Sequence, residues 1–138
     1  TALRARAFGM RILFYDPHLP SGVELSLGFE RVLDLESLVS QADVMSIHAP
    51  LDQSTERLIN RNLLGVGKRG QILVNTARGP IVDLDAVYEC LQSGQLGGAG
   101  LDVLPEEPAN PSHPLIKAYH ERADWLEGSH SHSACGIL

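Results

Sequence analysis

The sequence predicts an α/β fold built around a parallel sheet, and two observations support this prediction. The stretch 71–75 is a short, largely apolar run between Gly70 and Gly79, which is typical of a strand buried on both faces of a parallel sheet. It ends abruptly in polar groups and one arginine. Further short apolar runs alternate along the chain with segments of helical periodicity, as α/β units do.

The first part of the chain is expected to hold a helix, a strand and a second helix. Residues 1–9 predict a helix that ends at Gly9 in a left-handed conformation. Residues 11–15 predict a strand, and residues 18–22 a turn-rich link. Asp34 is then placed to cap a short amphipathic helix.

The second part of the chain continues this alternation. Two more strands are expected, at residues 44–48 and 97–104. Asn60 and Asp83 are each placed to cap a helix, and Gly67 is expected to end the first of these helices. The proline-rich run 105–114 predicts a surface loop.

Polar side chains follow the expected strands, at the rim where open α/β sheets bind ligands. The planar guanidinium of Arg78 can hold a carboxylate through two parallel hydrogen bonds. A carboxylate at Asp16 can accept both ribose hydroxyls of an adenosine and would repel a 2′-phosphate, which favours NAD over NADP. Alternatives stay open, because Arg78 could be a solvated loop charge and Asp16 a turn residue before Pro17.

The composition argues against several classes of protein. The 138 residues, 43% hydrophobic and 20% charged, are typical of one globular domain. A formal net charge of −6, with no basic run longer than 68–69, argues against a nucleic-acid surface. Cys90 and Cys135 form no zinc-like pattern, so we expect no metal site and a reduced intracellular compartment. The sequence has no apolar run of membrane-spanning length and no signal peptide, so we expect a cytoplasmic protein.

Ordered motifs in the chain resemble a known family. Residues 75–79, with the sequence Asn-Thr-Ala-Arg-Gly, are followed by Ile-Val-Asp at 81–83 and by the acidic, proline-containing run 101–108. Together they resemble the signature of the NAD-dependent D-isomer-specific 2-hydroxyacid dehydrogenases. The run 14–17 looks closest to the branch that contains C-terminal-binding protein and its bacterial relatives.

The resemblance covers residues 1–128 and implies a partial NAD-binding domain. The implied fold is a Rossmann-type, doubly wound parallel sheet. The implied cofactor is NAD, the implied substrate is a small 2-hydroxy or 2-keto acid, and the intact protein is expected to be a homodimer.

The resemblance also implies roles for single residues. Arg78 would bind the substrate carboxylate, and Glu107 would hydrogen-bond the histidine that acts as general base. Asp102 would accept from the nicotinamide carboxamide, and a carboxylate inside a buried strand would need such a partner. His48 is an implied cofactor contact, although a histidine at a strand end is often only structural. The implied cofactor contacts are Asp16, Pro17, His48, Pro50, Thr76, Ala77, Arg78 and Asp102.

Both ends of the chain depart from the family pattern. The first strand and the glycine-rich phosphate loop are expected to be missing from the sheet. Residues 129–138 do not match the family's segment around the catalytic histidine. Permitted codons for these residues, read one base later, encode Arg-Ile-Val-Thr-Pro-His-Ala-Ala-Phe, so we interpret the tail as frameshifted. On this hypothesis His130 and His132 are not the general base.

Three interpretations of function stay open. The chain is a dehydrogenase fragment that is inactive alone because the catalytic histidine is absent. Alternatively, it is an NAD-sensing binding module similar to the C-terminal-binding-protein co-repressors. A third interpretation is a translation product that never folds stably, because removal of a central strand leaves unpaired sheet edges.

Overall fold

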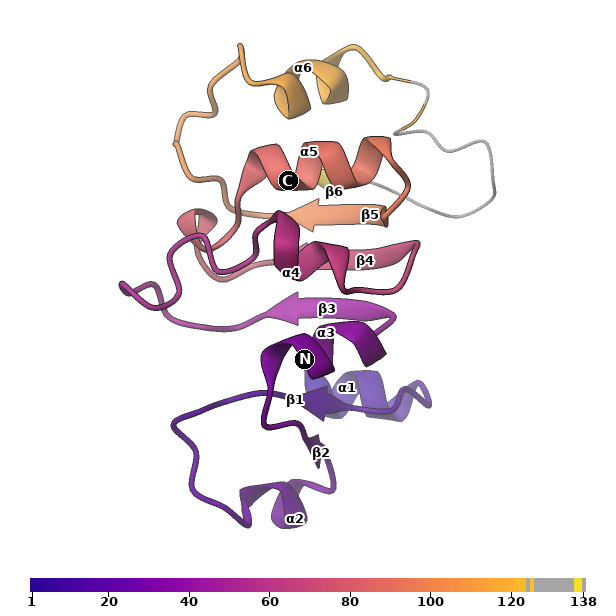
Figure 1. Ribbon diagram of the computed structural model, residues 1–138, viewed down its shortest axis with the longest axis vertical. Coiled ribbons are helices and arrows are strands. Elements are labelled where there is room, and N and C mark those ends of the chain that lie inside the picture. The colour runs from indigo at the N-terminus through magenta and orange to yellow at the C-terminus, as the bar shows by residue number, and fades with distance from the viewer. Residues whose placement is uncertain (124, 126–135, 138) are drawn as a thin grey trace.

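The structure is a computed structural model that describes residues 1–123, 125 and 136–137. Its strands form two parallel sheets, one of two strands in the order β1-β2 and one of four strands in the order β3-β4-β5-β6 (Figure 1). The predicted α/β class with parallel strands is therefore confirmed. The strands are β1 (Leu13–Phe14), β2 (Glu30–Arg31), β3 (Val44–Ile47), β4 (Gln71–Asn75), β5 (Leu96–Leu101) and β6 (Gly136–Ile137).

Helices connect the strands on the route predicted for an α/β chain. They are α1 (Ala2–Ala7), α2 (Val23–Leu27), α3 (Leu35–Gln41), α4 (Arg61–Gly65), the 3₁₀ turn η1 (Gly79–Ile81), α5 (Leu84–Gln92) and α6 (Pro114–His120). The sequence did not predict α2, β2, α6 or β6, because each is short and lacks a clear hydrophobic period.

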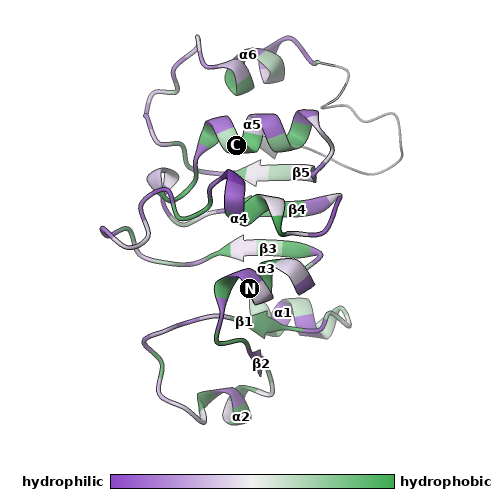
Figure 2. Cartoon of the chain, in the orientation of Figure 1, coloured by the Kyte–Doolittle hydropathy of each residue, from purple (hydrophilic) through white to green (hydrophobic). Residues whose placement is uncertain are grey.

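The hydrophobic core lies in the four-stranded sheet and the helices beside it. Leu73 in β4 is fully buried, as is Val87 on the inner face of α5. Figure 2 shows green, hydrophobic stretches in the strands and largely hydrophilic loops where the strands end. Cys90 also packs in this core as a free thiol, and burial raises its pKa.

All three predicted helix caps are present. The Asp34 side chain accepts from the backbone N–H of Ser37 at 2.7 Å at the start of α3. The Asn60 side chain caps α4, and Asp83 accepts from two backbone N–H groups at the start of α5. These carboxylate and amide oxygens satisfy N–H groups that have no partner inside the helix.

The helix end predicted at Gly67 is confirmed, since α4 ends at Gly65 and Val66 is its C-cap. Gly67 itself is not in a left-handed conformation, because its backbone angle φ is not positive. Gly67 is needed for space instead, because a Cβ there would lie 2.4 Å from Oε1 of Gln71. The buried Gln71 side chain donates to the backbone carbonyls of Val39 and Ala42, so it caps the end of α3.

The N-terminal part of the chain is packed much less closely. None of residues 1–38 is buried, and α1 has no buried residue, so this helix covers no core. Leu3 in α1 and Phe8 just after it are 61% and 87% exposed. The predicted strand 11–15 is also shorter than expected, since only Leu13–Phe14 pairs, with β2.

The break between the two sheets coincides with the place of one strand in the predicted strand order. In the doubly wound order 3-2-1-4-5-6, strand 1 lies between strands 2 and 4. Here β2 and β1 take the places of strands 3 and 2, and β3 takes the place of strand 4, so the break falls where strand 1 belongs. Among the described residues, none occupies that place. No helix in the described part of the chain is both long enough and apolar enough to cross a lipid bilayer.

Candidate functional site

The predicted site residues all follow the carboxyl ends of strands. The segments after β1, β3, β4 and β5 leave the sheets on one side, the left side of Figure 1. Pairing of Asn75 with Leu101 makes β4 and β5 end together, and the N–H of Asp102 donates to the carbonyl of Asn75 at 3.0 Å. The structure therefore places along one rim Asp16 and Pro17, His48 and Pro50, Thr76, Ala77 and Arg78, and Asp102 and Glu107.

Arg78 stands exposed on a turn that Asn75 holds in place. The Asn75 side chain is fully buried, accepts from the N–H of Ala77 at 3.0 Å and donates to the carbonyl of Arg78 at 3.0 Å. One Nη of Arg78 donates to the carbonyl of Ala77 at 2.7 Å. Arg78 forms no ion pair with a described residue, so most of its guanidinium is available to an anion.

Sequence reasoning missed the role of Asn75. The available signal was an amide at the end of an otherwise apolar strand, directly before the turn that carries Arg78. A buried amide must find hydrogen-bond partners, and the nearest backbone groups are those of the turn. Asn75 therefore fixes the path of the chain into Arg78.

A close backbone contact joins the turn after β4 to the segment after β5. A Cβ placed on Gly79 would lie 2.0 Å from the carbonyl carbon and oxygen of Leu104, which is closer than any side chain allows. The glycine that follows Arg78 therefore lets the two segments touch through their main chains.

The structure corrects the prediction for Asp102. Strand β5 ends at Leu101, and the Asp102 side chain is exposed just beyond it. The carboxylate therefore needs no protein partner to offset burial, contrary to the reasoning from a buried strand. The structure shows that Asp102 lies at the rim, beside the end of β4. Its contact with the nicotinamide stays a prediction.

Asp16 shows features of both interpretations that the sequence left open. Its Oδ1 accepts from the N–H of His18 at 2.9 Å, which is the turn geometry expected before Pro17. Among the described residues, Oδ2 has no hydrogen-bond partner. The same loop is held by Arg31, which donates to three of its backbone carbonyls and which sequence reasoning did not single out.

Two predicted site residues, His48 and Pro50, follow β3. His48 is exposed, and its Nε2 lies 2.9 Å from Oγ of Ser46. The carbonyl of Pro50 accepts from the hydroxyl of Thr55 at 2.7 Å. Both residues lie at the expected rim, and their role as cofactor contacts stays a prediction.

Glu107 and its neighbour Glu106 are both exposed after β5. Glu106, but not Glu107, lines the pocket described below. No hydrogen bond or ion pair joins Glu107 to a histidine among the described residues, and His130 and His132 lie outside them.

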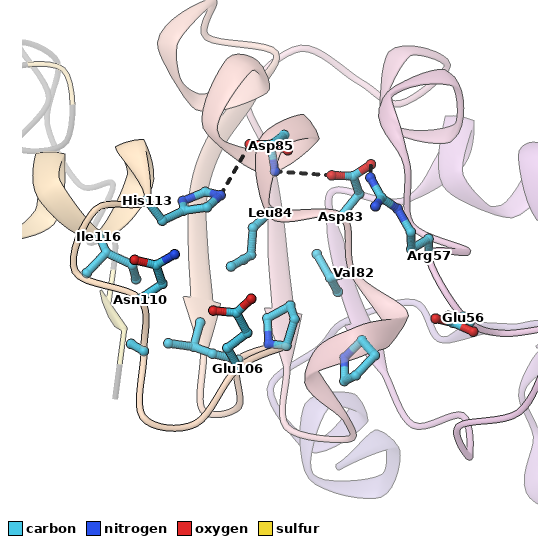
Figure 3. Close-up of a pocket in the computed structure, with 14 residues that line it drawn as sticks. Glu56, Arg57, Val82, Asp83, Leu84, Asp85, Glu106, Asn110, His113 and Ile116 are labelled. Atoms are coloured by element: carbon cyan, nitrogen blue, oxygen red, sulfur yellow. Dashed lines mark hydrogen bonds and ion pairs between the residues drawn. The ribbon is translucent and has the colours of Figure 1, made fainter.

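A separate pocket of about 410 Å³ lies beside the rim, between the start of α5 and the loop after β5 (Figure 3). Its walls combine apolar side chains such as Leu84 and Ile116 with charged ones, including Arg57, Asp85 and Glu106. None of the predicted site residues lines this pocket. This pocket therefore lies next to the predicted site and is not the site itself.

Two polar pairs close the wall of this pocket. Nη2 of Arg57 donates to Asp83 at 2.6 Å, and Nε2 of His113 lies 3.2 Å from Asp85. Partial burial alone would raise the pKa of Asp83, but the hydrogen bonds from Arg57 and from the N–H of Ala86 outweigh it and lower the pKa. These pairs hold the start of α5 and of α6 in position.

The rim residues fit a bound dinucleotide. The free Oδ2 of Asp16 can accept from a ribose hydroxyl at one end of the rim. At the other end, Asp102 follows β5 directly beside the Arg78 turn. There the Asp102 carboxylate could accept from a nicotinamide carboxamide, and the Arg78 guanidinium could bind the carboxylate of a substrate. Both acids are accessible to a ligand, because Asp102 is exposed and Asp16 is half-buried.

Comparison with known proteins identifies a family of similar chains. A family profile described as "D-isomer specific 2-hydroxyacid dehydrogenase, NAD binding domain" matches residues 1–122. A glyoxylate reductase of Korarchaeum cryptofilum is 47% identical over 116 residues, which cover 84% of this chain and 35% of that protein. The chain thus spans about a third of the length of this curated relative.

Solved structures of similar chains have the same arrangement. The D-lactate dehydrogenase of Aquifex aeolicus, solved in complex with NAD and lactic acid, matches with a TM-score of 0.72 and 36% identity over 87% of this chain and 34% of that one. A glyoxylate reductase from Paecilomyes thermophila matches with a TM-score of 0.77 and 33% identity over 99% of this chain and 37% of that one. The finer resemblance to the C-terminal-binding-protein branch stays a prediction.

Proposed function

Because the chain belongs to the D-isomer specific 2-hydroxyacid dehydrogenase family, in its NAD-binding domain, we propose that it serves hydride transfer between NAD and a small 2-hydroxy or 2-keto acid. Membership of this family confirms the predicted fold class and confirms NAD as the cofactor. The activity itself belongs to a longer protein, of which we propose that this chain is the nucleotide-binding part.

One observation carries the proposal. In this proposal the reaction uses Asp16, Arg78, Asp102 and Glu107, and all four belong to segments that follow strand ends on the same side of the sheets. Arg78 and Asp102 are fixed relative to each other by the pairing of β4 with β5 and by the backbone contact at Gly79. A cation for the substrate and an acceptor for the cofactor therefore sit on one rigid support.

Each residue has a definite task in this proposal. Arg78 binds the substrate carboxylate through its guanidinium, which orients the 2-carbon for reaction. Glu107 hydrogen-bonds a histidine from another part of the protein, and this histidine takes or gives the hydroxyl proton. Asp16 and Asp102 hold the two ends of the cofactor, whose nicotinamide ring supplies or accepts the hydride.

The tail is the subject of a separate proposal. We propose that residues 1–128 form the partial NAD-binding domain and that residues 129–138 are read in a shifted frame. The family profile ends at residue 122, which supports a boundary near this point. Reading the encoding DNA tests the idea, because codons that cannot yield Thr-Pro-His in the neighbouring frame would rule it out.

Cofactor binding is the first experimental test. NAD at about 100 times its dissociation constant should stabilise the 138-residue chain by about 2.7 kcal/mol in thermal denaturation. Asp16→Ala should weaken this effect, whereas Asp43→Ala should not, since Asp43 lies before β3 at the opposite end of that strand. Absence of any shift at millimolar NAD would overturn the proposal.

Substrate binding is tested in the longer protein. Arg78→Lys keeps the charge but loses the paired hydrogen bonds to a carboxylate. We expect kcat/KM for a 2-keto acid to fall by about tenfold or more, mainly through a higher KM. The dimeric state of the intact protein is part of the same proposal and is measured by sedimentation.

A further inference from the structure

Among the described residues, three of the four hydrogen bonds of the loop that carries Asp16 come from one side chain. Loop residues 16–20 contain no buried residue and make only one hydrogen bond within the loop, from the N–H of His18 to Asp16. The other bonds all come from Arg31, whose two Nη atoms donate to the carbonyls of Asp16 at 2.9 Å, Leu19 at 2.7 Å and Pro20 at 3.2 Å. Among the described residues, the shape of this loop therefore depends on Arg31.

The position of Arg31 is fixed by the two-stranded sheet. Arg31 pairs with Phe14, and the N–H of Val32 donates to the carbonyl of Phe14 at 2.9 Å. Next to it in β2, Glu30 forms an ion pair with Arg11 at 3.7 Å. The guanidinium reaches from β2 across the end of β1, and its buried Nε has no partner among the described residues. A planar group with five N–H donors can serve several carbonyls at once, which a lysine ammonium does less well.

We propose that Arg31 is a positioning residue for the adenosine end of NAD. It pulls the carbonyls of loop 16–20 toward β2 and so fixes the direction in which the free Oδ2 of Asp16 points. Both Nη atoms of Arg31 donate to backbone carbonyls, so in this proposal the guanidinium does not bind a phosphate of the cofactor. This inference rests on the proposed function for its cofactor part, whereas its effect on the loop is independent of NAD.

The test compares three variants of the 138-residue chain. Arg31→Met keeps an unbranched apolar stem and removes the guanidinium, and Arg31→Lys keeps the charge without the planar fork. Arg11→Met is the matched control, because it removes an arginine that lies just before β1 and pairs with Glu30 of β2, without a contact to the loop. Amide hydrogen exchange is measured without cofactor, followed by titration with NADH. Amides of β4 serve as an internal reference for the integrity of the fold.

We expect the His18 amide to exchange about tenfold faster in Arg31→Met than in Arg11→Met, because its bond to Asp16 depends on the loop conformation. The dissociation constant for NADH should rise about tenfold in Arg31→Met. Arg31→Lys should restore neither the His18 exchange rate nor the dissociation constant for NADH in full. This result would separate the effect of loop geometry from attraction between a positive charge and the phosphates of the cofactor.

The outcomes separate the inference from the proposed function. Equal His18 exchange in Arg31→Met and Arg11→Met would overturn the inference, whatever the affinity for NADH. Full rescue by Arg31→Lys would also overturn it, because charge alone would then be sufficient. If the unaltered chain does not bind NADH while its loop stays protected, the proposed function fails, and the cofactor part of the inference fails with it.

Discussion

The N-terminal region, residues 1–38, and the sheet region, residues 39–123, obey the same local rules but differ in packing. Both regions contain parallel strand pairs, capped helices and side-chain-stabilised turns at strand ends. Yet no residue of the N-terminal region is buried, whereas the sheet region holds the hydrophobic core. Local sequence signals are therefore sufficient to shape the N-terminal region, but they do not give it a core.

The difference lies in what each sheet has beside it. Strands β4 and β5 have parallel neighbours on both sides, whereas β1 pairs only with β2 among the described residues. Side chains gain burial when strands are flanked on both edges and covered on both faces. A strand between β1 and β3 would connect the two regions into one sheet. The effect of such a connection on stability can be measured by comparing substitutions in the two regions.

The largest expected effect tests the core directly. Leu73 in β4 is 0% exposed, and Leu25 in α2 is 84% exposed. Leu73→Ala should lower the free energy of unfolding by about 2–5 kcal/mol, because it leaves a cavity in packed surroundings. Leu25→Ala should change it by less than about 0.5 kcal/mol. Urea denaturation measures both, and similar losses would break the contrast between the regions.

A second, smaller effect compares the same turn in the two regions. The Asn75 side chain accepts from the N–H of Ala77 at 3.0 Å, and Asp16 accepts from the N–H of His18 at 2.9 Å. Asn75→Ala should cost about 1–3 kcal/mol, because Asn75 is buried and its loss leaves the N–H of Ala77 without its acceptor. Asp16→Ala, in a more exposed turn, should stay within about 0.5 kcal/mol in the absence of NAD. An equal loss in thermal denaturation would argue that burial does not decide the stability of these turns.

The smallest effect is a pH dependence. Hydrogen bonds from Arg57 and the N–H of Ala86 lower the pKa of Asp83 despite partial burial, relative to about 3.9 in the unfolded chain. Asp83 therefore stabilises the fold above about pH 4, and this contribution is lost as the pH falls through the lower folded-state pKa. Asp83→Asn keeps a capping oxygen but does not titrate.

Melting temperature as a function of pH provides the measurement. Between about pH 5 and pH 2, the melting temperature of Asp83→Asn should fall less steeply than that of the unaltered chain. Asp34→Asn is the control from the N-terminal region. The hydrogen bonds of the Asp34 carboxylate with Ser37 lower the pKa of Asp34 as well, but its cap is fully exposed to solvent. Parallel curves for all three proteins would contradict the assignment to Asp83.

The sheet region was the easier part to predict from the sequence. The bounds of β4 agree with the structure at both ends, because its apolar run is flanked by turn residues on each side. The caps at Asn60 and Asp83 were also predicted, as was the cap at Asp34 in the N-terminal region, since a capping side chain acts within its own helix. Such features depend on neighbours in sequence and leave a local pattern.

The missed features depend on distant neighbours. Arg31 serves carbonyls 11 to 15 residues away, and no local pattern reveals which loop it will reach. Asp102 was placed inside a buried strand because the apolar run continues past it, but β5 ends one residue earlier, at Leu101, where its partner β4 also ends. Strand ends are set by pairing as well as by composition, which a single segment does not show.

The glycine after Arg78 has a mechanical consequence for the site. With no side chain between Gly79 and Leu104, a displacement of one segment must be transmitted to the other without any rotatable group to absorb it. The turn that carries Arg78 and the backbone at Leu104 therefore form one close contact. A methyl group added at position 79 would force this contact apart, so Gly79→Ala should displace the Arg78 turn from the segment after β5 while leaving the guanidinium itself unchanged.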